Sequence, residues 1–122
     1  SVGRNGTEQQ LMSDFYSELM GQPEIAVATG TAASSGDNTL VAAPGSGKRL
    51  VLLFLKVQNE STTATTCTVK HGSTVVDRVK LAENDAYIRE YECPRVLPTN
   101  TALVLNLSGA NSHGYTVETT TI

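Results

Sequence analysis

The sequence predicts a mainly β protein: an antiparallel, jelly-roll-like β-sandwich of about seven or eight strands, with one N-terminal α-helix. Apolar and polar residues alternate in short runs about 8–12 residues apart, separated by Gly, Pro and Asn. The length of 122 residues suits one compact domain. Charged residues are 17% of the chain, below the roughly 25% of ordinary soluble domains. Thr, Ser, Ala and Asn fill the difference, as is typical of β-rich proteins.

The first expected element is a helix over Thr7–Met20. Thr7 and Gln10 form a capping box at its start, and Gly21 and Pro23 end it. A helix of about 14 residues is marginal alone in water, so its apolar stripe needs a cover, either its own sheet or a neighbouring subunit. The stripe consists of Leu11, Met12, Phe15, Tyr16, Leu19 and Met20. We therefore divide the chain into an arm and helix, residues 1–22, and a sandwich, residues 23–122.

After the helix the hydrophobic period changes to two, which indicates strands. Glu24–Thr29 is expected to be a strand with Ile25 and Val27 on one face. The small residues of Gly30–Asn38 predict a surface loop, and Thr39–Ala43 a short strand.

The strongest β segment is Arg49–Val57, which follows a turn at Pro44–Gly47. Strict alternation divides its apolar residues between two faces, with Val51, Leu53, Leu55 and Val57 on one and Leu50, Leu52 and Phe54 on the other. A strand that is apolar on both faces must be covered on both. One face therefore belongs to the core, and the other needs the helix or a second copy of the protein. On this basis Leu52 and Phe54 join the helix stripe as candidate interface residues.

Further alternating runs predict the remaining strands, and His71–Ser73 predicts a hairpin turn between the first two. Three groups of residues are expected to face inward: Cys67 with Val69, Val75 with Val79 and Leu81, and Leu103 with Leu105 and Leu107. Asp77 is an odd polar member of the second group, and Tyr115 and Val117 face inward from the last run. The runs are Ala64–Lys70, Thr74–Leu81, Tyr87–Glu92, Ala102–Ser108 and Tyr115–Thr121.

Composition and charge exclude several classes of function. A net charge of −3 argues against binding to nucleic acid, which needs a basic face. No apolar run reaches the roughly 18–20 residues of a membrane span. The Pro44–Arg49 segment differs from a phosphate-binding loop because Ala42 replaces its first Gly, Arg49 replaces its hydroxyl residue and a strand follows.

No catalytic, cofactor-binding or metal-binding residue is expected. Ser112 and His113 are neighbours on a strand and point to opposite faces, so they cannot form a nucleophile–base pair. His71 falls in a turn, and the acidic residues around Tyr87 do not have the spacing of a calcium loop. Cys67 and Cys93 do not match a zinc site. They are either free thiols or a disulfide, and the sequence leaves both open. The protein is therefore expected not to be an enzyme.

Three short segments resemble small β-sandwich proteins of tailed-bacteriophage virions. They are Gly47–Leu50, which opens a long strand, Thr68–Thr74, which forms a hairpin, and Ala102–Ser108, which forms a later strand. The likeness spans residues 44 to 119, with its parts in the same order. His71 stands where such proteins usually have Ser, and the N-terminal helix lies outside the likeness.

The resemblance implies a non-enzymatic virion protein, made in the host cytoplasm, and between head and tail we favour a decoration (cement) protein on the head surface. Its partners would be the major capsid protein and further copies of itself, with a trimer favoured, and the arm would dock on a neighbour. The alternative is a tail or fibre module that binds a host glycan through loops near Gly30–Asn38, Glu83–Tyr87 and Gly109–Gly114. A hydrolytic or lyase domain is a third and weaker interpretation.

Overall fold

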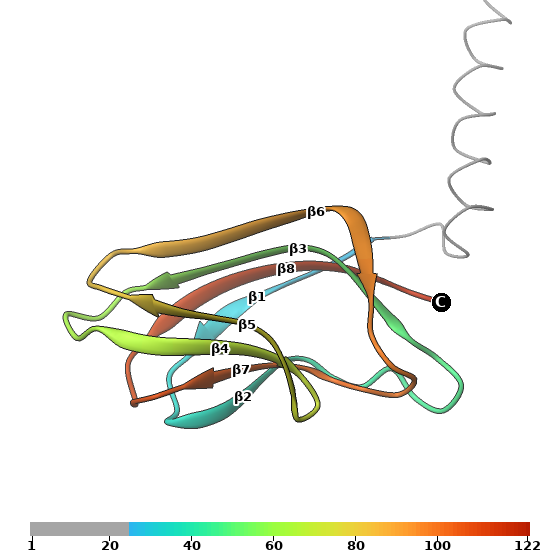
Figure 1. Ribbon diagram of the computed structural model, residues 1–122, viewed down its shortest axis with the longest axis horizontal. Helices are drawn as coiled ribbons and strands as arrows, with labels where there is room; N and C mark the ends of the chain where they lie inside the picture. The colour runs from blue at the N-terminus through green and yellow to red at the C-terminus, as the bar shows by residue number, and fades with distance from the viewer. Residues whose placement is uncertain (1–24) are drawn as a thin grey trace, which may run out of the picture.

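The computed structural model describes residues 25–122, which form two four-stranded antiparallel β-sheets packed face to face (Figure 1). Sheet A has the strand order β1-β8-β3-β6, and sheet B has the order β2-β7-β4-β5. The predicted mainly β sandwich is confirmed, whereas the expected arm and helix lie outside the described residues. The strands are β1 (Ala26–Ala32), β2 (Gly36–Val41), β3 (Leu50–Asn59), β4 (Thr65–His71), β5 (Thr74–Leu81), β6 (Ala86–Val96), β7 (Leu103–Leu107) and β8 (His113–Thr121).

The strands pair in a nested order. β4 pairs with β5 through a tight hairpin, β3 pairs with β6, β2 with β7, and β1 with β8. Successive pairs fall alternately in the two sheets, which is the strand order of a jelly roll. The first and last strands therefore lie side by side in sheet A, where β8 also pairs with β3.

The core lies between the sheets and is built mostly from leucine and valine. β3 and β8 supply it from sheet A, and β4 and β7 supply it from sheet B. The expected inward residues of β4 and β7 are all buried there. The fully buried apolar side chains of these four strands are Leu52, Leu55, Val57, Cys67, Val69, Leu103, Leu105, Leu107 and Val117.

A β-bulge at Leu53 corrects the expected faces of the longest apolar strand. In the pairing with β8, Leu52 lies opposite Thr119 and Phe54 opposite Glu118, so β3 has one extra residue at that point. An extra residue reverses the alternation beyond it. Leu50 and Leu52 therefore share the core with Leu55 and Val57. The expectation that Leu52 faces outward with Phe54 was wrong.

A second bulge, in β5, moves Val75 out of the core. Asp77 lies opposite Val69 and Val75 opposite Lys70, so Val76 is the extra residue. Val76 packs against the core, and Val75 is 57% exposed instead of facing inward as expected. Asp77 does share the inner face with Val79, as the sequence suggested.

The expected loop over Gly30–Asn38 is much shorter. β1 continues to Ala32 and β2 already begins at Gly36. The small residues of this segment belong to the two strands. On β1, Ala28 and Ala32 pack against the core at the edge of the sandwich. Gly30 lies opposite Tyr115, and a Cβ on it would stand 2.8 Å from the Tyr115 hydroxyl oxygen. Gly at this position leaves room for the tyrosine ring.

Replacing Leu52 with Ala tests the bulge. We expect the free energy of unfolding to fall by about 2–5 kcal/mol, because the substitution leaves a cavity in the core. Val75→Ala is the matched control and should change it by less than about 0.5 kcal/mol, since Val75 is exposed. Urea unfolding followed by circular dichroism measures both, which suits a chain without Trp. Equal, small effects of the two substitutions would show that Leu52 lies outside the core.

Candidate interaction surfaces

The described residues hold no cluster of metal-ligating side chains. Within residues 25–122, no group of three or more His, Cys, Asp and Glu could hold a metal ion. One of the acidic residues near Tyr87, Asp85, accepts a hydrogen bond at Oδ2 from the Ala82 amide at 3.1 Å. The same part of the chain has no helix long and apolar enough for a membrane span. The candidate binding features of these residues are therefore surfaces.

The turn that resembles a phosphate-binding loop has a structural role. The Lys48 amide donates a hydrogen bond to the Gly45 carbonyl oxygen at 3.1 Å, which closes the turn. Arg49 Nε donates to the Leu97 carbonyl oxygen at 2.9 Å. Arg49 thereby ties the start of β3 to the segment after β6.

The candidate interface residues are only partly brought together. Leu52 is completely buried, and Phe54 is half-buried on the outer face of sheet A. Phe54 lies in a depression of about 370 Å³ that is also lined by Leu53, Tyr91 and three glutamates. The outer face of β3 is therefore less apolar than the sequence predicted. The other six candidates lie in residues 1–24, outside the described residues: Leu11, Met12, Phe15, Tyr16, Leu19 and Met20.

The most apolar exposed feature of sheet A lies on β1 and just before it. Ile25 is 60% exposed and Val27 is 62% exposed. Val27 lies on the outer face, because it is opposite Glu118 of β8, which in turn is opposite Phe54. β1 ends the sheet and has the sequence AVATGTA, without any charged residue. The sequence placed Ile25 and Val27 together on a strand, and did not identify the strand as an edge.

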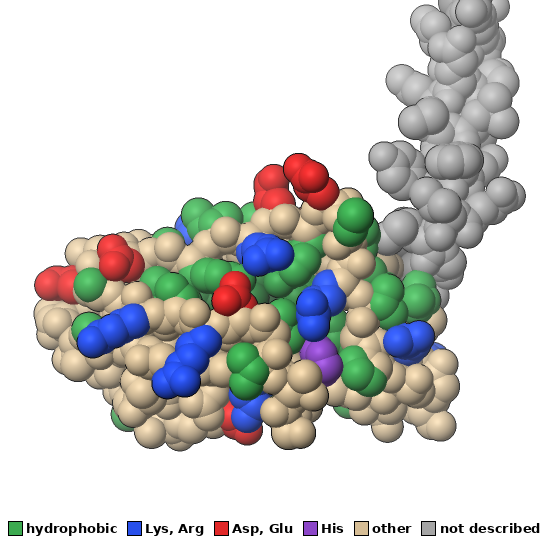
Figure 2. All heavy atoms as spheres, viewed as in Figure 1, with side chains coloured by type: hydrophobic (Ala, Val, Ile, Leu, Met, Phe, Trp, Pro, Cys, Tyr) green, Lys and Arg blue, Asp and Glu red, His purple; other side chains and the backbone are tan. Residues whose placement is uncertain are grey.

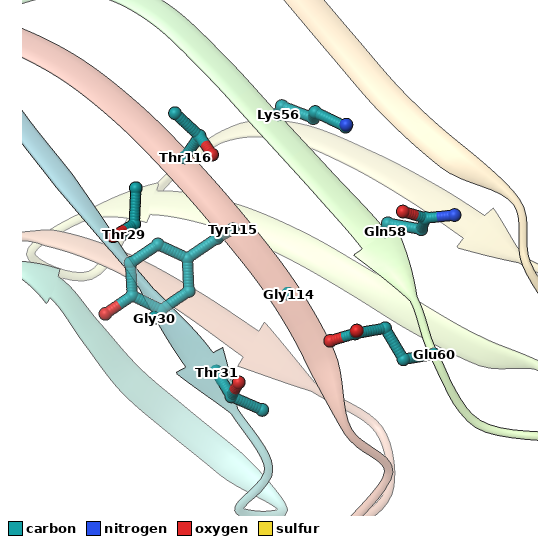
Figure 3. A pocket seen from close by; sticks show the side chains of 9 residues that line it. All are labelled: Thr29, Gly30, Thr31, Lys56, Gln58, Glu60, Gly114, Tyr115 and Thr116. Atoms are coloured by element: carbon teal, nitrogen blue, oxygen red, sulfur yellow. The ribbon is translucent and has the colours of Figure 1, made fainter.

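A polar hollow of about 280 Å³ lies beside β1 on the outer face of sheet A (Figure 3). Thr29 and Thr116 stand on one side of Gly114, and Thr31 and Glu60 stand on the other. Gly114 opens the space, since a Cβ there would lie 2.7 Å from the Glu60 carboxylate oxygen. Lys56 and Gln58 also line the hollow.

Three polar side chains on the outer face of sheet B bind one another. Lys70 Nζ lies 3.0 Å from Asp37 Oδ1, and Asn106 Nδ2 donates to the same oxygen at 2.7 Å. The hydrogen bonds from Asn106 and Lys70 lower the pKa of Asp37. By contrast, Lys56 and Glu60 of the hollow have no ion pair within residues 25–122. The hollow on sheet A thus offers two charged groups that have no ion pair among the described residues.

A cluster of Tyr87, Asp77 and Arg89 joins the two sheets where the edges of β5 and β6 face each other. The Tyr87 hydroxyl donates to Asp77 Oδ2 at 2.6 Å, and Arg89 Nη1 lies 3.8 Å from the same oxygen. Arg89 also stacks 5.2 Å from the centre of the Tyr91 ring. Figure 2 shows hydrophobic side chains between β6 and β5, with charged side chains across them. The cluster closes the open side of the sandwich over the core.

Hydrogen bonding and burial shift the pKa values of this cluster in opposite directions. The hydrogen bond from Tyr87 lowers the pKa of Asp77, and the Arg78 amide and Arg89 add to that effect. Burial and the hydrogen bond to Asp77 raise the pKa of Tyr87, and burial raises the pKa of Tyr91. The sequence indicated that Asp77 faces inward. It did not show that Asp77 and Tyr87 meet, because they lie on different sheets.

His113 is completely buried at the start of β8 and belongs to the core. Its Nδ1 lies 2.7 Å from the Asn111 carbonyl oxygen, which fixes Nδ1 as the protonated nitrogen. Nε2 has no hydrogen-bond partner among the described residues. The Asn111 carbonyl oxygen thereby orients the ring.

Both cysteines are free thiols, and their surroundings differ. Cys67 is buried in the core, and Cys93 is exposed on β6 where the regular pairing with β3 is interrupted between Glu90 and Arg95. Burial raises the pKa of the Cys67 thiol to about 11. Only the thiolate is a nucleophile, so Cys67 is protected both by burial and by protonation.

The comparisons with known proteins do not show a family. No family model and no curated protein matches the chain. Among solved structures, the chain is similar to a crystal structure of PirA at 12% sequence identity and a TM-score of 0.35, over 80% of this chain and 92% of that chain. A TM-score this low carries no argument about fold or function.

Replacing Tyr87 with Phe should lower the free energy of unfolding at neutral pH by about 1 kcal/mol, because Asp77 loses a hydrogen bond. The folded state lowers the pKa of Asp77, so this stabilisation is complete above the unfolded pKa of about 4 and is lost as the pH falls through the folded value. The difference between the two proteins should therefore shrink on acidification. Urea unfolding at several pH values measures it. Tyr115→Phe is the control, and an equal pH dependence in that variant would contradict the role of Asp77.

A thiol reagent at neutral pH should modify one cysteine per folded chain. Cys93 should react quickly, and Cys67 only after unfolding, because it is buried with a raised pKa. The absorbance of the coloured group that each thiol displaces from the reagent counts the modified thiols. Cys93→Ser should abolish the fast reaction. Two fast thiols in the folded protein, or none, would contradict the structure.

Proposed function

We propose that this chain is a non-enzymatic structural protein of a tailed-phage virion that attaches to the head surface as a decoration (cement) protein. One structural observation supports an assembly role: Ile25 and Val27 are exposed beside an uncharged sheet edge, directly after residues 1–24. The phage assignment itself rests on the sequence resemblance. In this proposal the N-terminal segment and the first strand form one continuous attachment surface.

The attachment would work by burying apolar area across the junctions between capsid subunits. Each square ångström of buried apolar surface is worth about 25 cal/mol before the costs of association. Many copies on one head would raise the overall strength of weak single contacts, and copies that also contact one another would bind more tightly still. The resemblance implies a trimer for such self-association. The major capsid protein would be the other partner.

A host-glycan-binding module of the tail is the second candidate, and the hollow beside β1 favours it. Three threonine hydroxyls, an amide, an ammonium and a carboxylate line that hollow. Such groups are the hydrogen-bond partners that a sugar would need. A glycan array compared with binding to phage heads separates the two candidates, because each assay reports one of them.

Replacing Val27 with Glu should weaken binding to phage heads about tenfold or more, because it places a charge in the proposed apolar contact. Val75→Glu is the matched control: Val75 is equally exposed but lies on β5 in sheet B, and its variant should bind as the wild type does. Co-sedimentation with heads assembled from the accompanying major capsid protein measures both.

Deletion of residues 1–22 should abolish co-sedimentation while circular dichroism still reports a folded sandwich. Normal binding by this truncated protein would overturn the arm as an attachment element. Normal binding by Val27→Glu would separately overturn the role of β1.

A further inference from the structure

The four strands that end the two sheets differ in how they are protected against pairing with another chain. Edge strands usually carry charges, proline or bulges that prevent such pairing. β2 carries Asp37 and an irregular register, and β5 carries three charged residues and the bulge at Val76. β6 carries four charged residues and Pro94. Each of these three edges thus has at least two protective features.

β1 has none of these features. Its seven residues contain no charge and no proline, and its register with β8 is continuous from Ala26 to Ala32. β8 lies on one side of it, and no strand of the described residues lies on the other. Its outward-directed backbone groups therefore form a regular, uncharged row open to a further strand.

We propose that β1 pairs with β1 of a second copy of this chain, antiparallel and about a two-fold axis at Thr29. This rests on the self-association part of the proposed function, but gives a dimer in place of the trimer that the resemblance implies, and it does not depend on attachment to phage heads. A two-fold axis at Thr29 is the arrangement that pairs every residue of β1. It joins the two copies of sheet A into one eight-stranded sheet, which is within the usual range of sheet sizes.

The side chains of β1 are compatible with this register. Thr29 lies opposite its own copy, a favourable cross-strand pair, and Val27 lies opposite Thr31. No like charges meet, because the strand has none. The contact is isologous, so it closes after two copies and does not continue into a fibre. The match of side chains across the axis favours a second copy over an unrelated partner strand, whose side chains would not be matched to β1.

Light scattering tests the proposal on the full chain. We expect a mass of about twice 12.9 kDa at high concentration, with dissociation to monomers on dilution. Thr29→Lys places two like charges opposite each other at the axis and should raise the dissociation constant about tenfold or more. Thr29→Glu should do the same, and a mixture of the two variants should recover a heterodimer, identified by native mass spectrometry. Val75→Lys, on the edge of sheet B, should leave the mass unchanged.

Disulfide trapping tests the register, in a Cys93→Ser background. Thr29→Cys should form a disulfide-linked dimer on oxidation, since the two Cα atoms face each other across the axis. Thr31→Cys is the control and should not, because its two copies would be several residues apart, beyond the about 7 Å that a disulfide can bridge.

Four results would overturn the proposal: a monomer at all concentrations, a trimer, no recovery in the mixture, or no cross-link at position 29. A monomer whose β1 amides are protected from hydrogen exchange would assign the edge to residues 1–24 of the same chain. Binding to phage heads by Thr29→Lys is scored separately, so failure of the dimer and failure of the decoration role remain distinguishable.

Discussion

The arrangement of the sandwich depends on the β-bulge at Leu53. β3 is central in sheet A, between β8 and β6, and is the longest apolar strand of the chain. Without the extra residue, regular alternation could bury Leu50 and Leu52 or Leu55 and Val57, but not both pairs. The bulge places all four in one core and leaves a short outer face with Val51 and Phe54. A single inserted residue thus concentrates the apolar side chains of β3 on one side.

This constraint changes which surfaces are available for assembly. The sequence pattern predicted an apolar outer face of β3 that needs a cover, but that face is largely reduced to the half-buried Phe54. The exposed apolar side chains at the two ends of sheet A are Ile25 and Val27 at one end and Ile88 and Val96 at the other. Of these ends, β6 is bent and charged, and β1 is regular and uncharged. The surface that favours association is therefore the β1 edge of sheet A, and not the outer face of β3.

The sequence predicted the class of fold because alternation and turn residues are local signals. The hairpin at His71–Ser73 and the leucines of β7 are both read from neighbouring residues, and both were predicted correctly. The bulges at Leu53 and Val76 could not be read in this way. Each is defined by the register with a partner strand, which depends on residues far along the chain. The length of β1 was missed because its small residues resemble a loop.

The candidate site shows the same division between local and distant information. The sequence marks Asp77 as an odd polar member of an inward face, but its contact with Tyr87 depends on how two sheets stack. That β1 is an exposed edge also depends on the strand order. In the middle of a sheet, a strand without charges would not be available to pair with another chain. Residues 1–24 contain six of the eight interface residues expected from the sequence, so that part of the prediction stays untested.

The position of β8 has a consequence for how the protein is made. This strand is the last of the eight in the chain, yet it lies between β1 and β3 in sheet A. Sheet A therefore cannot be completed on the ribosome until the C-terminal residues have emerged. Until β8 has emerged, β1 lacks its only described neighbour, and a nascent chain would expose it. Such long-range pairing slows folding, and it gives polysomes carrying this message an extended period in which neighbouring chains could exchange strands.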